Sequence, residues 1–145
     1  MLKQGVLGVR GASLAANAPG TTQPGYIFAD LTIQDRGDTG ISGVHIAEVK
    51  LCKVNVPPPC AASGQSILLK GDSYAQGKET WTLKVAGQLV RSSGANIGNE
   101  LGDYRIVHVG LLDYAGNYVG LDSIEFGGTT DFKTLFDNTI FTLTP

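Results

Sequence analysis

The chain has 145 residues, a length typical of one domain, and its 42% hydrophobic residues are sufficient for a packed core. Eleven Lys and Arg face thirteen Asp and Glu without any basic cluster, which argues against binding to nucleic acid or to anionic lipid. No stretch approaches the roughly 20 apolar residues that cross a membrane. The 20 Gly residues indicate frequent turns rather than long helices.

The N-terminal segment, residues 1–24, is expected to be a flexible leader or a first edge strand. An A-x-A-like site occurs at residues 16–18, but Arg10 interrupts the apolar stretch before it and Pro19 follows it directly. Both features argue against a signal peptide. We therefore expect residues 25–145 to form a single domain.

Alternation of apolar and polar residues predicts strands along most of the remaining chain, because every second side chain of a strand faces the core. In residues 79–90, Trp81 lies on the apolar stripe and is a candidate core anchor. In residues 104–112 the stripe changes face between Ile106 and Val107, which predicts a β-bulge. The expected strands are residues 26–35, 44–54, 66–70, 79–90, 104–112, 118–126 and 139–144. With turn residues between them, they predict a sandwich or barrel.

The two cysteines, Cys52 and Cys60, enclose a loop with three consecutive prolines. Their spacing does not suit a C-x-x-C redox pair, and further zinc ligands are missing nearby. A disulfide would add about 2.5 kcal/mol by the chain-entropy estimate and would require an oxidising compartment. Two free thiols in a cytosolic protein are the alternative.

Two segments resemble bacterial extracellular immunoglobulin-like modules. Residues 102–117, GDYRIVHVGLLDYAGN, look like the G-x-Y … V-x-L-x-D-x-A-G-N signature of these repeats. Upstream, LTIQD (31–35) followed by SGV (42–44) is similar to their v-x-v-x-D … S-G-V element. The resemblance covers residues 26 to about 126, and it departs from the family at the Cys52–Cys60 loop and after Gly127.

This resemblance implies an all-β, immunoglobulin-like antiparallel β-sandwich of about seven to nine strands. It also implies an extracellular or cell-surface setting, as in surface adhesins, secreted hydrolases and polysaccharide-associated proteins. Tyr104, at the start of a late strand, is similar to a tyrosine corner, whose hydroxyl bonds to backbone a few residues upstream.

Polar turn residues suggest a metal site at one end of such a sandwich. The strands that end at Asp35 and Asp113 are expected to finish at the same pole, which would bring four oxygen-bearing side chains together. These candidate ligands are Asp35, Asp38, Asp113 and Asn117, a set suited to Ca²⁺. Alternatively, each aspartate caps the backbone of its own turn.

Aromatic residues provide candidate ligand-binding positions, because sugar rings stack on exposed aromatic faces. The candidates are Tyr26, Phe28, Tyr114 and Tyr118. Tyr26 and Phe28 lie on the face of their strand opposite Ile27, Leu31 and Ile33. Alternatively, this second face packs beneath a terminal segment.

The sequence favours a binding or spacing role over catalysis. The two histidines, His45 and His108, accompany no G-x-S-x-G or H-E-x-x-H motif, so we expect no enzyme activity. The leading hypothesis is a module for adhesion, spacing or surface attachment, with calcium as a candidate stabilising ion, whose partners are neighbouring domains, a glycan or a surface protein. The alternatives are a carbohydrate-binding module of a secreted hydrolase, and a subunit of a surface assembly that offers residues 139–144 as an edge strand.

Overall fold

The computed structural model describes residues 2–10, 26–35, 42–62, 64–88 and 98–143. This part of the chain contains eight strands and two short 3-10 helices, η1 (Ile124–Phe126) and η2 (Phe132–Thr134). The strands are β1 (Leu2–Arg10), β2 (Tyr26–Gln34), β3 (Val44–Lys53), β4 (Ser66–Asp72), β5 (Thr80–Gln88), β6 (Gly102–Asp113), β7 (Tyr118–Asp122) and β8 (Ile140–Leu143).

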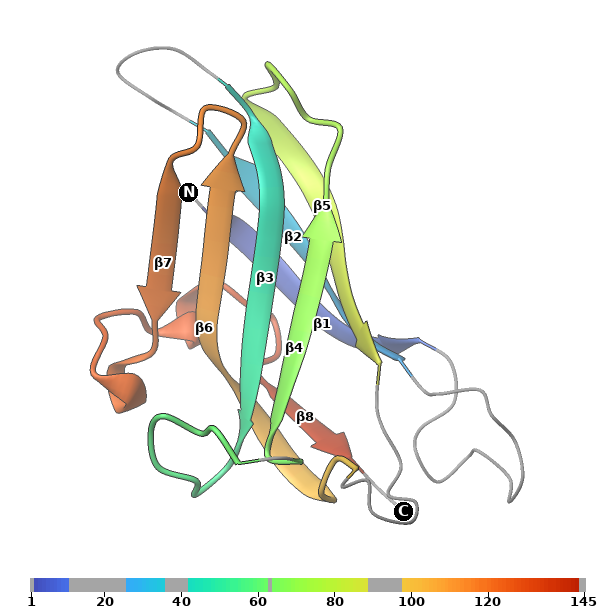
Figure 1. Ribbon diagram of the computed structural model, residues 1–145, viewed down its shortest axis with the longest axis vertical. Coiled ribbons are helices and arrows are strands. Elements are labelled where there is room, and N and C mark those ends of the chain that lie inside the picture. The colour runs from blue at the N-terminus through green and yellow to red at the C-terminus, as the bar shows by residue number, and fades with distance from the viewer. Residues whose placement is uncertain (1, 11–25, 36–41, 63, 89–97, 144–145) are drawn as a thin grey trace.

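The fold is all-β and antiparallel, as predicted, and hydrogen bonds connect the strands into one sheet that curls into a half-barrel, an arrangement compatible with a β-sandwich. Their order is β1-β2-β5-β4-β3-β6-β7, and β8 also pairs with β6. The sheet folds over, so that β1 and β2 cross behind β3 and β6 (Figure 1). The two layers expected from the sequence are therefore two halves of a continuous sheet.

The two halves join where β4 meets β5, through the single residue pair Lys70 and Ala86. Glycine permits the close approach on both strands. A Cβ atom at Gly71 would lie 2.3 Å from the carbonyl oxygen of Lys84, and one at Gly87 would lie 2.5 Å from that of Leu68. Because real Cβ atoms do not approach an oxygen so closely, a larger residue at either position would push the halves apart.

The core lies between the two halves and follows the predicted alternation. On β2, Ile27, Ala29 and Leu31 are completely buried, and on β5 Val85 is as well. From the other half, β3, β4 and β6 contribute Val49, Leu69 and Val109, among others. Trp81 packs against this core but is only partly buried, so it borders the core rather than anchoring its centre.

The predicted bulge in β6 is confirmed at Val107. Opposite it on β3, Lys50 pairs with His108 while the next residue, Leu51, pairs with Ile106, which leaves Val107 as an extra residue. As a result, Ile106 and Val109 both face the main core. Val107 instead joins a second, smaller cluster on the outside of the sheet.

That second cluster contains the predicted disulfide. The Sγ atoms of Cys52 and Cys60 lie 1.99 Å apart, and both residues are buried beside Val107. Val56 and Phe126 pack against them. The bulge and the disulfide therefore support each other, because the extra residue of β6 fills the space beneath the loop that the disulfide closes.

One edge of β6 is shared by two strands in succession. β8 pairs with Gly102–Arg105, and β7 pairs with the stretch from His108 to Leu112. The expected strand at 118–126 is therefore shorter than predicted, since β7 ends at Asp122 and η1 follows. η1 in turn ends at Gly127, which adopts a φ of 80° and donates its N–H to the carbonyl of Ile124.

At the N-terminus, β1 forms an edge strand beside β2, which is one of the two expected states of this segment. Residues 11–24 of the expected leader lie outside the described residues. At the other end of the chain, η2 begins directly after Asp131, and its Phe132 packs in the main core.

Tyr104 forms the expected tyrosine corner. Its hydroxyl lies 2.5 Å from the carbonyl oxygen of Glu100, four residues upstream, and 2.9 Å from that of Gly64. Burial, together with the Glu100 carboxylate, raises the pKa of Tyr104 to about 12, so the hydroxyl stays protonated and donates. The side chain thereby ties the segment before β6 to the loop before β4.

Tyr104→Phe is expected to lower the free energy of unfolding by about 1–2 kcal/mol, because a buried donor is lost and its acceptors are left without it. Urea unfolding measures the change. Tyr74→Phe is the matched control, since Tyr74 is 94% exposed and should tolerate the change. Equal stability of the Tyr104→Phe protein and the wild type would contradict the tyrosine-corner role.

Candidate functional site

Asp35 lies at one pole of the sandwich, where several loops meet around Gly43. Its Oδ2 accepts hydrogen bonds from the backbone N–H of Ser42 at 3.0 Å and of Gly43 at 2.7 Å. Gly43 in turn accepts a bond from the N–H of Tyr114, at the start of the β6–β7 turn. The D … S-G-V element and the D-x-A-G-N element identified in the sequence are thus in direct contact.

Only glycine fits at position 43. Its φ is 89°, a region that other residues rarely adopt, and a Cβ atom there would lie 1.9 Å from the carbonyl oxygen of Ala75. The β4–β5 loop, which carries Ala75, is held in the same place by a 2.7 Å bond from the N–H of Gly77 to the carbonyl of Ser42. Three loops therefore converge on one residue.

Asp113 organises the β6–β7 turn at this pole. Its Oδ1 accepts bonds from the N–H groups of Ala115 and Asn117 at 2.9 and 2.8 Å, and its Oδ2 accepts one from Asn117 Nδ2 at 2.9 Å. Desolvation acts to raise the pKa of Asp113, but the hydrogen bonds, chiefly from Asn117, outweigh it and hold the pKa below its usual value.

Three of the four predicted metal ligands are brought together. Asp35, Asp113 and Asn117 line one small cavity of about 60 Å³, as the sequence predicted for the two aspartates. Asp38 lies outside the described residues. Each aspartate also caps its own turn, which is the alternative the sequence left open. Within the described part of the chain, no three His, Cys, Asp or Glu side chains are grouped closely enough to hold a metal, so calcium stays a prediction.

The four predicted aromatic positions do not form one site. Phe28, on the outer face of β2, lies beneath the Lys84 ammonium, which is 4.4 Å from its ring centroid. Tyr114 stacks on His45, with 4.4 Å between the ring centroids, and its hydroxyl donates to the carbonyl of Ser73. For Tyr26 only the backbone is described, in β2.

Tyr118 is 57% exposed on the outer face of β7, whereas Phe28 and Tyr114 are both partly buried. It lies over a pair of glycines, Gly110 of β6 and Gly120 of β7, which face each other across the ladder. A Cβ atom at Gly110 would lie 2.6 Å from the Tyr118 hydroxyl, so a larger residue there would displace the ring. The glycine pair provides the space in which the tyrosine lies against the sheet.

Polar side chains surround this tyrosine. His108 Nε2 lies 3.0 Å from the Tyr118 hydroxyl, and its Nδ1 lies 2.8 Å from Asp122 Oδ1. Glu48 of β3 lies on the other side, with its Oε1 3.7 Å from His108 Nε2. We call Tyr118, His108, Asp122 and Glu48, with the two glycines beneath, the tyrosine platform.

The Tyr118 phenol is a hydrogen-bond donor within the platform. Partial burial, together with the charges of Glu48 and Asp122, raises the pKa of Tyr118. The phenol therefore stays protonated and can donate its hydrogen bond. With its ring proton on Nδ1, His108 donates to Asp122 and accepts from Tyr118, which fixes the orientation of all three side chains.

Sequence reasoning identified Tyr118 but missed its neighbours. His108 accompanies no catalytic motif and therefore does not stand out in the sequence. Once a bulge at Val107 is assumed, however, the alternation of β6 places His108 and Gly110 together on its outer face. That pattern, with Gly120 two residues after Tyr118, was the available signal.

Comparison with models of known protein families, with curated proteins and with solved structures gave no match to this chain. In the described part of the chain, no helix has the length and apolar character needed to cross a bilayer. The function is therefore inferred from the geometry of the residues themselves.

Replacing Asp113 with Asn is expected to flatten the dependence of stability on acid pH. In the folded protein the pKa of Asp113 is lowered, so its carboxylate adds stability above the unfolded-state pKa of about 4. This stability is lost as the pH falls through the lower folded-state value. Urea unfolding at several pH values between about 5 and 2 measures the effect.

Asp137→Asn is the matched control, since Asp137 is exposed and lies outside the β6–β7 turn. Its pH profile should follow that of the wild type. If Asp113→Asn gave the same slope as the wild type, the turn would not depend on the Asp113 carboxylate.

Proposed function

We propose that the chain is a non-catalytic module of an extracellular or cell-surface protein, used for adhesion, spacing or surface attachment. The tyrosine platform is the observation that carries this proposal. It presents an exposed aromatic ring with two carboxylates beside it, and its position is set by a glycine pair rather than by core packing. Such a combination of apolar surface and convergent polar groups is typical of a recognition face.

The disulfide supports the extracellular setting. Cys52 and Cys60 are within bonding distance, and structural disulfides form and persist chiefly in oxidising compartments. The chain-entropy stabilisation it provides is useful to a small β-rich module exposed to the extracellular environment.

Calcium at the loop pole is a further part of this proposal. Asp35, Asp113 and Asn117 supply oxygen atoms around a single cavity, as a hard cation requires. If the ion binds, adding millimolar Ca²⁺ to chelated protein will raise the melting temperature by mass action on the folded state. An unchanged melting temperature would leave the aspartates with their turn-capping role alone.

A carbohydrate-binding module is the second candidate function, and the tyrosine platform favours it specifically. Sugar rings stack on aromatic side chains, and their hydroxyls donate to carboxylates such as those of Glu48 and Asp122. By contrast, Tyr114 is engaged with His45 and Ser73, so it is less suited to stack on a ligand.

On a glycan array, the Tyr118→Ala protein is expected to bind its preferred sugar about tenfold more weakly or worse, equivalent to ~1.4 kcal/mol. Tyr118→Phe keeps the ring and should retain most of the binding. Tyr74→Ala, which removes a 94% exposed tyrosine from a different loop, is the control. Equal binding by the Tyr118→Ala and wild-type proteins would exclude the platform as the sugar site.

A further inference from the structure

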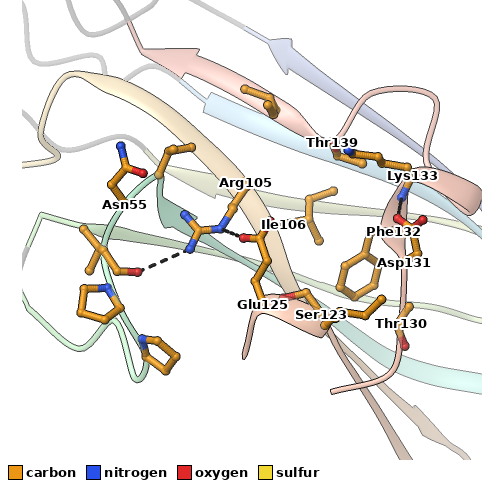
Figure 2. Close-up of a pocket in the computed structure, with 16 residues that line it drawn as sticks. Asn55, Arg105, Ile106, Ser123, Glu125, Thr130, Asp131, Phe132, Lys133 and Thr139 are labelled. Carbon is orange, nitrogen blue, oxygen red and sulfur yellow. Dashed lines mark hydrogen bonds and ion pairs between the residues drawn. The ribbon is translucent and has the colours of Figure 1, made fainter. Parts of the chain in front are cut away.

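A groove of about 800 Å³ lies beside β6, in the gap between the end of β7 and the start of β8. The disulfide-closed loop forms one wall, and the segments of η1 and η2 form the other (Figure 2). The residues that matter for its chemistry are Val56, Arg105, Ile124, Glu125, Lys133 and Ile140. We call it the Arg105 groove. It lies apart from the tyrosine platform, whose residues are not part of its lining.

Arg105 is a cation held in place within this groove. Its side chain is only 17% exposed. Nη1 donates to the carbonyl of Lys53 at 3.0 Å, and Nη2 donates to the carbonyl of Val56 at 3.4 Å. These two backbone acceptors fix the guanidinium but do not neutralise it, so it retains a strong preference for a carboxylate.

The chain's own carboxylate at this position is Glu125. Its Oε2 lies 2.5 Å from Arg105 Nε, and the pair is visible at the centre of the groove in Figure 2. Glu125, however, is 65% exposed and belongs to η1, a single turn of 3-10 helix. Because the Glu125 side chain is mostly in water, another carboxylate can displace it from Arg105 while the guanidinium keeps a partner.

Exposed apolar side chains flank the same cation. Ile124 is 63% exposed and Ile140 is 46% exposed, and both line the groove. Large apolar residues that gather around a concave surface mark an interaction site more often than isolated ones do. The preference of Arg105 for a carboxylate and the two exposed isoleucines therefore favour one occupant that carries both a carboxylate and apolar side chains.

Lys133 also favours an anionic ligand. Its ammonium extends along the groove toward Thr139 (Figure 2) and adds a second positive charge to a lining that also contains the carboxylates of Glu125 and Asp131. Ser123 lines the groove as well, but its hydroxyl has almost no accessible surface, so it does not contact the occupant.

We propose that the Arg105 groove binds a short acidic peptide segment of a partner protein. The carboxylate of the segment replaces Glu125 beside Arg105 Nε, while Nη1 and Nη2 continue to donate to the carbonyls of Lys53 and Val56, an arrangement that a Lys ammonium cannot reproduce. Its apolar neighbours cover Ile124 and Ile140. This peptide site is independent of the sugar-binding candidate and gives the module a second recognition surface.

The test uses the full chain and matched pentapeptides. The probe is acetyl-Gly-Ile-Glu-Ile-Gly-amide, and its counterpart carries Gln in place of Glu. Titration followed by amide and Arg side-chain NMR gives both affinity and location. We expect shifts at Arg105 Nε–H and at the amides of Ile124 and Ile140, with the Gln peptide at least about tenfold weaker, because it lacks the charge-assisted bond.

Three variants separate the parts of the proposal. Glu125→Gln removes the internal competitor and should tighten binding of the Glu peptide by about twofold to fivefold. Arg105→Lys keeps the positive charge but loses the planar set of N–H donors, and should weaken binding of that peptide by about tenfold. Ile124→Ser should also weaken it. Leu68→Ser, at an apolar residue 47% exposed on β4, is the matched control and should leave affinity unchanged.

The proposal is overturned if the Glu and Gln peptides bind equally or if neither binds. It is also overturned if Glu125→Gln has no effect, or if the shifts appear at Gly110 and Gly120 of the tyrosine platform instead. The final measurement titrates the protein with propionate alone. If it matches the peptide in affinity, the groove is an anion site and not a peptide site.

Discussion

The extra residue in β6 is the constraint on which both candidate sites depend. Because Val107 is not paired with β3, Tyr104 and Ile106 before it face the main core, and Val109 after it does so too. The same shift places Arg105 and His108 on the outer surface, on either side of the bulge. Arg105 enters the groove between β7 and β8, whereas His108 orients the tyrosine platform on β7. Without the bulge, β6 would direct either Arg105 or His108 toward the core.

A second constraint lies at the loop pole, where Gly43 fixes three connections at once. Its amide donates to Asp35, its carbonyl accepts from Tyr114, and Ala75 leaves no space for a side chain. This arrangement gives a physical reason for the spacing between Asp35 and the S-G-V element, because the carboxylate must reach back to Ser42 and Gly43. The pole is therefore stabilised by backbone hydrogen bonds, with or without an ion.

The strand pattern was predictable because alternation reports directly on burial. The strands and the bulge followed from it, whereas the tyrosine corner and the proximity of Asp35 to Asp113 followed from the resemblance and from the sandwich topology that it implies. The joining of both halves into one sheet was not predictable, since only one residue pair of β4 and β5, Lys70 and Ala86, is in ladder register, and the close approach around it depends on Gly71 and Gly87. Nor was the Arg105 groove, because its walls come from segments far apart in sequence. The strand expected at 118–126 was too long because its apolar residues, including Ile124 and Phe126, continue into a 3-10 turn.

The most direct test of this account is the register of β3 against β6, measured from cross-strand NMR contacts between backbone protons. The account predicts that Lys50 lies opposite His108 and that Leu51 lies opposite Ile106, with Val107 unpaired on that side. Contacts that place Leu51 opposite Val107, in an uninterrupted ladder, would contradict it. In that case the two halves of β6 would not both keep their present orientation. Arg105 could then not line the groove while His108 lies beside Tyr118.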